Sequence, residues 1–328
     1  GREMARFMDA KVIIFDIKRF AINDGPGLRT TIFFKGCPLA CSWCHNPESR
    51  DSRPALLFRP SRCIRCLACV EACPNRAVAA PEGVPVTDYS ACRADGGCVE
   101  ACPAGAREIV GREYSVEARM EEIRKDRVFY DESGGGVTFS GGEPLSQPGF
   151  LSSLLRACRR EGIHTAVDTC GFAEPGLFLE TAALADLVLF DLKAMNPATH
   201  LQLTGVYNME ILRNLSLLSG SDTEVLIRIP LVPGANDDEE NLRATGIFVS
   251  GLAGSPGVEL LPFHPMTREK HRRFSLPYRG PSEQEYPGER IERAGEILEG
   301  FGVRVILPAA DRDDREKEGR NGKDNANE

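Results

Sequence analysis

The chain has 328 residues, of which 42% are hydrophobic, so it is long enough for one large domain and a smaller one. Its formal net charge of -8 argues against a nucleic-acid partner. No apolar run approaches the roughly 18 residues that a membrane span needs, and the first residues lack the apolar centre of a signal peptide. The composition therefore predicts a soluble, cytoplasmic protein without a membrane or nucleic-acid partner.

Ten of the 12 cysteines stand in groups with short, regular spacing, and two of these groups end in Cys-Pro. A secreted disulfide framework is the alternative for so many cysteines. Regular short spacing is more typical of metal ligation in a reducing compartment. The sequence therefore predicts that these thiols are metal ligands.

Apolar strand-like runs alternate with amphipathic helical patterns over most of the chain, which is typical of βα units and a parallel sheet. The predicted strands are Val12 to Ile17, Thr30 to Phe34, Gly136 to Ser140, His164 to Asp168, Leu187 to Asp191, Val225 to Ile229, Val258 to Pro262 and Val303 to Leu307. The predicted helices are Ser115 to Lys125, Gly149 to Glu161, His200 to Ser219, Glu239 to Gly251 and Glu289 to Gly300. The fold class is therefore predicted to be α/β.

The loop after the second predicted strand contains Cys37, Cys41 and Cys44, spaced C-x3-C-x2-C. Three thiolates on a four-iron cubane leave one iron open to a ligand that is not protein. A structural zinc site is the alternative, because His45 could complete a Cys3His set. The spacing alone leaves both kinds of site open.

The residues around this loop resemble the glycyl-radical-enzyme activating enzymes of the radical S-adenosylmethionine (SAM) superfamily. The signature of that family, G-x-G-x-R and then F-x2-G-C-x3-C-x-W-C, is matched at Gly25, Gly27, Arg29, Phe33, Gly36, Cys37, Cys41, Trp43 and Cys44. The resemblance extends over most of residues 10 to 307. It favours an iron-sulfur cluster over zinc and implies a partial (β/α)6 radical SAM barrel. It also implies that Cys37, Cys41 and Cys44 hold the catalytic SAM-binding 4Fe-4S cluster, with Trp43 beside the cofactor.

A second cysteine run matches the bacterial ferredoxin pattern C-x2-C-x2-C-x3-C-P, and a third run repeats its ending. The crossed ligation of such ferredoxins assigns Cys63, Cys66, Cys69 and Cys102 to one cluster, and Cys73, Cys92 and Cys98 to another. Asp95 stands where the second cluster would have its fourth cysteine. Asp95 is either an oxygen ligand of a 4Fe-4S cluster or a solvated loop acid beside a 3Fe-4S cluster, and the sequence leaves both open.

These runs predict that residues 59–108 form a ferredoxin-like insertion with two clusters. The radical SAM barrel would then consist of residues 1–58 and 109–308, followed by a disordered charged tail at residues 309–328. The insertion has little apolar mass, so we expect it to unfold when its iron is removed.

Active sites of βα folds lie at the carboxyl ends of the strands. Residues at or after the predicted strands match family positions that bind SAM, and these are Gly141, Gly142, Glu143, Asp168, Thr169, Asp191, Lys193, Arg228 and His264. The resemblance implies that Glu143 holds the amino group of SAM, and that Asp168, Thr169 and Asp191 lie near its carboxylate with a monovalent cation. The alternatives are an ordinary Gly-Gly-Glu-Pro turn, helix-capping acids, a surface arginine and a structural histidine.

The resemblance implies an activating enzyme that reductively cleaves SAM to a 5'-deoxyadenosyl radical. That radical would abstract a hydrogen atom from a glycine Cα of a partner glycyl-radical enzyme of the lyase, dehydratase or decarboxylase type. Ferredoxin or flavodoxin would donate the electron, and the enzyme is expected to be a monomer. A radical SAM enzyme acting on a small molecule is the alternative, and a pure electron-transfer module is a third, weaker one.

Overall fold

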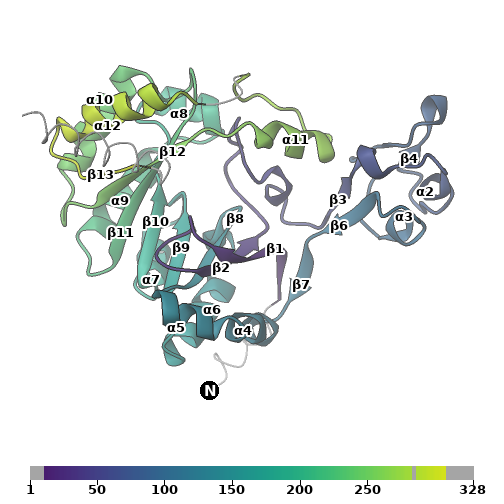
Figure 1. Cartoon of the computed structure of the whole chain (residues 1–328), viewed down its shortest axis with the longest axis horizontal. Coiled ribbons are helices and arrows are strands. Elements are labelled where there is room, and N and C mark those ends of the chain that lie inside the picture. Colours follow the sequence, from purple (N-terminus) through teal and green to yellow (C-terminus); the bar gives the residue numbers. More distant parts are fainter. Residues whose placement is uncertain (1–10, 283–285, 308–328) are drawn as a thin grey trace, which may run out of the picture. The chain divides into compact units, whose positions relative to one another are not determined.

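The computed structural model describes residues 11–282 and 286–307 (Figure 1). The chain divides into two compact units, which we call unit 1 (residues 1–165 and 266–280) and unit 2 (residues 166–265 and 281–328). The tail predicted at residues 309–328 lies outside the described residues. In the described part of the chain, no helix is both long and apolar enough to span a membrane.

Four strands of the large sheet lie in unit 1, in the order β8-β2-β1-β7. Their bounds are β1 (Val12–Ala21), β2 (Arg29–Phe34), β7 (Arg112–Tyr114) and β8 (Gly136–Gly141). β2 and β8 are parallel, whereas β1 is antiparallel to both β2 and β7. Helices α4 (Val116–Arg124), α5 (Arg127–Ser133) and α6 (Pro148–Arg160) complete this part. The parallel pair brings the carboxyl ends of β2 and β8 to the same edge, which positions the loops that follow them.

The core of unit 1 is built on aromatic side chains of these elements. Phe34 of β2 is fully buried and contacts Phe139 of β8 and Phe150 of α6 edge-on, with ring centroids 6.2 and 6.0 Å apart. Cys158 of α6 is also fully buried and lies 3.8 Å from the Met120 sulfur, as expected for a small apolar residue.

Unit 2 contains five parallel strands in the order β13-β12-β11-β10-β9. They are β9 (Thr165–Thr169), β10 (Leu187–Asp191), β11 (Glu224–Leu231), β12 (Gly257–Pro262) and β13 (Val305–Ile306). The helices are α7 (Pro175–Ala182), α8 (Pro197–Thr204), α9 (Met209–Ser219), α10 (Glu239–Ser250) and α12 (Gly288–Glu299). Strands and helices alternate along the chain, so the predicted α/β class with a mostly parallel sheet is confirmed.

The single helix predicted from His200 to Ser219 is wrong, because the chain forms α8 and α9 there. Gly205 adopts a φ of 84°, which ends α8. Asn208 is fully buried and its side-chain amide donates to the carbonyls of Ala194 and Met195, at 2.9 and 2.8 Å. These hydrogen bonds hold the chain in a bend between α8 and α9, although the apolar periodicity of the sequence continues from one helix to the other.

The segment that contains the second and third cysteine runs begins and ends on one antiparallel ladder. β3 (Ala55–Phe58) pairs with β6 (Arg107–Val110), with Ala55 opposite Val110 and Phe58 opposite Arg107. Between them lie α2 (Ala68–Glu71), β4 (Val78–Ala79), β5 (Val86–Thr87) and α3 (Gly97–Glu100). This ladder falls at the predicted boundaries of the insertion, whose identity as a separate ferredoxin-like domain stays a prediction.

Candidate functional site

The three-cysteine loop leaves β2 and is held by its own backbone. The amide of Gly36 donates to the carbonyl of Ser49 at 2.6 Å, and that of Cys37 to Arg50 at 3.2 Å. Burial raises the pKa of the Cys37 thiol, and the charges of Glu143 and of the neighbouring Cys41 and Cys44 thiolates raise it further. A buried Cys37 thiol with a raised pKa fits a cationic iron centre, because the metal would offset the charge of the thiolate.

The Gly-Gly-Glu-Pro turn after β8 lies directly against this loop. The amide of Gly142 donates to the Phe34 carbonyl and that of Glu143 donates to the Gly36 carbonyl, both at 2.8 Å. A Cβ on Gly141 would lie 2.3 Å from the Phe34 nitrogen, and one on Gly142 would lie 2.3 Å from the Gly36 oxygen. Gly141 admits the backbone of β2 at close range, and Gly142 admits that of the cysteine loop.

Glu143 is buried to 1% exposure, and its Oε1 accepts a hydrogen bond from the Leu145 amide at 3.0 Å. The carboxylate is thereby fixed in direction beside the cysteine loop.

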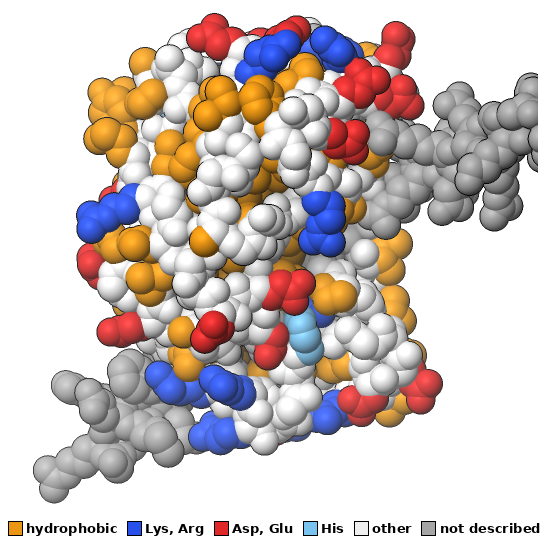
Figure 2. Space-filling view, turned by 90° about the vertical axis from the view of Figure 1, so that its left-hand side faces the viewer, with side chains coloured by type: hydrophobic (Ala, Val, Ile, Leu, Met, Phe, Trp, Pro, Cys, Tyr) orange, Lys and Arg blue, Asp and Glu red, His pale blue; other side chains and the backbone are white. Residues whose placement is uncertain are grey.

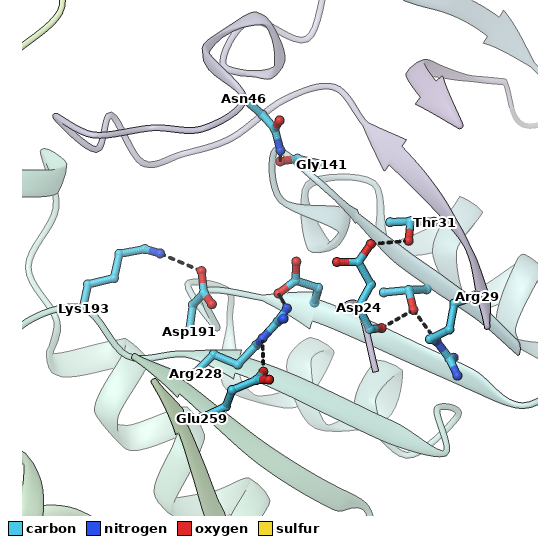
Figure 3. A network of polar contacts seen from close by, with 11 residues as sticks. Asp24, Arg29, Thr31, Asn46, Gly141, Asp191, Lys193, Arg228 and Glu259 are labelled. Carbon is cyan, nitrogen blue, oxygen red and sulfur yellow. Dashed lines mark hydrogen bonds and ion pairs between the residues drawn. The ribbon is translucent and has the colours of Figure 1, made fainter. Parts of the chain in front are cut away.

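Arg29 of the G-x-G-x-R motif has a structural task in unit 1. Its guanidinium is fully buried and donates to Thr138 Oγ1 at 2.6 Å and to the Val137 carbonyl at 2.7 Å, both on β8. Thr138 in turn donates to the backbone carbonyl of Asp24 at 2.6 Å, and Thr31 donates to the Asp24 carboxylate at 2.6 Å (Figure 3). Asp24 was missed in the sequence, where nothing but its place before Gly25 marks it.

A network of charged side chains lies on the strands of unit 2. Arg228 on β11 donates to Glu259 on β12 at 3.0 Å and lies 3.7 Å from an Asp168 oxygen on β9 (Figure 3). Asp191 is the register partner of Arg228, and Lys193 donates to Asp191 at 2.7 Å. The structure therefore brings together Asp168 with Arg228, and Asp191 with Lys193, whereas a role of these residues in binding SAM stays a prediction.

Glu259 was not predicted, although an acid at an alternating position of an apolar strand is a usable signal. Asn236 was also missed. It is fully buried, and its amide donates to the carbonyls of Lys193 and Pro230 at 2.6 Å each. It therefore fixes the backbone at Lys193. No periodic pattern marks such a residue.

The remaining predicted residues of unit 2 differ in exposure. Thr169 is buried, and its hydroxyl accepts from the Gly171 amide at 2.9 Å. His264 follows β12 and is exposed. Trp43 lies in unit 1, where it is buried to 4% exposure within the cysteine loop.

Helix α11 (Met266–Arg273) belongs to unit 1 and contacts the cysteine loop. The His271 ring is buried, with Nε2 lying 3.1 Å from the Cys44 carbonyl and Nδ1 lying 3.2 Å from the Pro277 carbonyl. Lys270 donates to the Asn46 side chain at 3.0 Å. Neither contact was predicted, because the lone histidine carries no motif.

Four cysteines of the segment between β3 and β6 line one pocket. They are Cys63, Cys66, Cys69 and Cys102, the same four that the crossed ferredoxin pattern assigns to one cluster. The backbone amide of Ala106 donates to the Cys102 sulfur at 3.3 Å. Such hydrogen bonds to sulfur are a feature of iron-sulfur sites, where they tune the reduction potential.

Of the other three cysteines of the segment, Cys98 belongs to a small core that also contains Leu56, Cys69 and Val78. Cys73 and Cys92 lie against that core. Burial is the main cause that raises the pKa of the Cys98 thiol, and the charges of Cys92 and Cys73 raise it further. Asp95 is exposed, and its carboxylate accepts from Asn75 at 2.5 Å and from the Gly97 amide at 3.1 Å. Both oxygens of Asp95 therefore accept hydrogen bonds, which is the arrangement expected of a loop acid that does not bind iron. Ligation of iron by Asp95 stays untested.

Comparison with known proteins gives the family. The Radical SAM superfamily model matches residues 31–245. The trans-4-hydroxy-L-proline dehydratase activating enzyme of Clostridioides difficile is 40% identical over 290 residues, which cover 88% of this chain and 96% of that protein. The chain belongs to the radical SAM superfamily.

Further radical SAM relatives support the narrower assignment. The choline trimethylamine-lyase activating enzyme of Oleidesulfovibrio alaskensis is 38% identical, over 83% of this chain and 89% of that protein. The benzylsuccinate synthase activating enzyme of Thauera aromatica is 38% identical, over 90% of this chain and 92% of its own. The resemblance to glycyl-radical-enzyme activating enzymes is therefore confirmed.

The radical SAM fold is also seen in solved structures. A radical SAM methyltransferase from Sphaerobacter thermophilus matches with a TM-score of 0.53 at 16% identity, covering 90% of this chain and 76% of that chain. Membership of the superfamily implies SAM and one 4Fe-4S cluster, and the three thiols of the loop after β2 fit that cluster.

Proposed function

We propose that the protein is an activating enzyme that uses SAM to place a radical on a glycine of a partner glycyl-radical enzyme. The observation that carries the proposal is the joining of the cysteine loop to the Gly-Gly-Glu-Pro turn by the hydrogen bonds of Gly142 and Glu143. The relatives named above activate dehydratase, lyase and synthase partners. This supports a partner of the glycyl-radical class without selecting one.

In this proposal Cys37, Cys41 and Cys44 hold the cluster, and Glu143 binds the amino group of SAM. A 4Fe-4S cluster with SAM supplies the reductive cleavage and the hydrogen-atom abstraction. The protein holds the cofactor in a fixed orientation and keeps water out, since Glu143 and Trp43 are both nearly fully buried.

We assign the carboxylate end of SAM to the residues of unit 2. Arg228 holds Asp168 in place through their ion pair, and Lys193 does the same for Asp191. The side chains of Asp168 and Asp191 are 22% and 28% exposed, so each carboxylate is partly accessible to a cation or ligand. Thr169 and His264 complete the proposed set, with a monovalent cation between the carboxylates.

We propose further that the seven remaining ligand cysteines, with or without Asp95, hold two clusters that pass electrons to the SAM-binding cluster. Ferredoxin or flavodoxin is the proposed donor, and a cytoplasmic monomer is the proposed form. The pocket lined by Cys63, Cys66, Cys69 and Cys102 supports the first of these clusters.

The test is to reconstitute the protein anaerobically with iron and sulfide, reduce it, and measure 5'-deoxyadenosine release from SAM. A peptide that copies a glycyl-radical loop should stimulate the release strongly, and a peptide with alanine in place of that glycine should not. A rate of SAM cleavage that neither peptide changes would overturn the activating function and leave the small-molecule alternative. A Cys41→Ala variant, which lacks one of the three thiols, controls for cleavage that does not need the loop.

A further inference from the structure

The two cysteine sets between β3 and β6 differ in exposure. Cys66, in the pocket with Cys63, Cys69 and Cys102, is exposed, and Ile64 on the rim of the same pocket is 66% exposed. In the other set Cys98 is only 6% exposed, and Cys73 and Cys92 are of intermediate exposure. Cys69 is buried and Cys63 and Cys102 are of intermediate exposure, so Cys66 is the one thiol of the two sets that is exposed to another protein.

Backbone geometry holds this rim in a tight turn. Arg65 and Leu67, on either side of Cys66, have φ values of 57° and 63°, a left-handed conformation that L-residues rarely adopt. Such a conformation is strained and persists where the surrounding structure requires it. The turn places Cys66 at its centre and leaves Arg65 exposed.

Charge also distinguishes the two sets. Residues 59–71, which carry Cys63, Cys66 and Cys69, contain three arginines and one acid, the exposed Glu71 that ends α2, so their net charge is +2. Arg59 pairs with Glu108 at 2.6 Å. Arg62 and Arg65 are both exposed, and neither forms an ion pair with a carboxylate in the described parts of the chain. Around the other set, residues 92–101 contain Arg93, Asp95 and Glu100, so that segment carries a net negative charge.

We propose that an acidic one-electron carrier protein docks on the rim formed by Arg62, Ile64 and Arg65 and reduces the cluster held by Cys63, Cys66, Cys69 and Cys102. This docking proposal rests on the proposed function, which assigns iron-sulfur clusters to these cysteines. One electron leaves the reduced carrier and enters the cluster, so the carrier is oxidised by one electron and no bond is formed.

The chemistry of the rim suits such a partner. Electron-transfer complexes bury less surface than stable interfaces, so a small rim with one exposed apolar side chain between two arginines fits the size of such an interface. Opposite charges raise the rate of encounter, and the effect falls with ionic strength. The basic rim would therefore attract an acidic carrier, whereas the net negative charge near Asp95 would repel it.

The test compares two charge-reversed variants of the reconstituted holoenzyme. Arg62→Glu/Arg65→Glu changes the rim, and Arg76→Glu/Arg93→Glu changes two exposed arginines near the other cysteine set. Cluster reduction by a reduced, acidic flavodoxin is followed by stopped-flow absorbance at low and high salt. Reduced methyl viologen, a small electron donor that needs no docking surface, is used in parallel.

We expect the rim variant to lose about tenfold in rate with flavodoxin at low salt and to lose most of its salt dependence. The Arg76→Glu/Arg93→Glu variant should stay within about twofold of the parent. With methyl viologen neither variant should be slower. An unchanged flavodoxin rate in the rim variant, or an equal loss in both variants, would overturn the docking site.

Failure of this proposal is distinguishable from failure of the proposed function. If methyl viologen supports peptide-stimulated SAM cleavage while the rim variant behaves as the parent, only the docking site is wrong. If methyl viologen reduces the clusters and no SAM is cleaved, the activating function is wrong, and the flavodoxin rates still decide the docking site.

Discussion

Gly142 shows how a motif glycine can serve the protein backbone. A Cβ there would lie 2.3 Å from the Gly36 oxygen, within the cysteine loop. We therefore expect Gly142→Ala to lower the free energy of unfolding by about 1–3 kcal/mol, the usual cost of overpacking, and to lower the iron content. Thermal denaturation and iron analysis measure both effects. Gly288→Ala is the control, because no atom lies within 4 Å of a Cβ there, and equal losses in the two variants would contradict the explanation.

Asp95 decides the nuclearity of one proposed cluster. Asp95→Cys should supply a fourth thiolate beside Cys73, Cys92 and Cys98, and convert any three-iron EPR signal to that of a full cubane, since thiolate is the softer ligand. Iron content should then rise by about one per protein. Asn75→Ala is the matched control, because it removes the hydrogen bond to Asp95 without adding a thiolate. Unchanged iron and spectra in Asp95→Cys would remove Asp95 from the cluster.

Tyr130 gives unit 1 a pH-dependent contribution to stability. Its burial raises its pKa to about 12, and the charge of nearby Asp126 acts in the same direction. A raised tyrosine pKa stabilises the fold below about pH 10, and this is lost at about 1.4 kcal/mol per pH unit above it. The advantage in free energy of unfolding over Tyr130→Phe should therefore shrink by about 1 kcal/mol between about pH 9 and about pH 11. Urea denaturation at both values tests this, and a constant difference would count against it.

Among the elements, β-strands were more predictable than their connections. β10 has the predicted bounds because a run of buried apolar residues ends in an acid. The division of α8 from α9 could not be predicted, since it depends on Asn208 reaching carbonyls that are distant in sequence. The same reason applies to the site. The cysteines and Glu143 carry a motif, whereas Asn236 and His271 act through contacts that only the fold creates.

Helix α11 is a second support for the cysteine loop. His271 contacts the Cys44 carbonyl, so His271→Ala would remove this contact and leave a cavity beside the loop. We expect the variant to release iron from the SAM-binding cluster to a chelator several-fold faster than the parent. Met266→Ala, on an exposed position of the same helix, is the control. Equal release rates in the parent and His271→Ala would show that α11 does not support the loop.

At the scale of the molecule, the chain distributes its proposed cofactor ligands between two units, with the cysteine loop in unit 1 and the charged strand residues in unit 2. Figure 2 shows apolar side chains interspersed with both basic and acidic ones on one face of the molecule. That mixture is as expected from a chain with 40 basic and 48 acidic residues.

The small core between β3 and β6 leads to a prediction about the whole protein. It includes Cys69 and Cys98, which are proposed cluster ligands, so removal of iron takes away part of what holds it together. We expect anaerobic chelation to make residues 59–108 sensitive to protease while the rest of unit 1 and all of unit 2 stay resistant. Mass spectrometry of the fragments locates the cuts. Resistance of this segment in the iron-free protein would contradict the prediction.

The β3–β6 ladder has a consequence for how this architecture can arise. Because Ala55 lies opposite Val110, the chain leaves and re-enters the rest of the protein at neighbouring points. A stretch of DNA that encodes everything between could be gained or excised in a single event, with a short turn closing the gap and the flanking strands keeping their places. The segment that carries the two cysteine sets could therefore be gained or lost in evolution independently of the residues proposed to bind SAM.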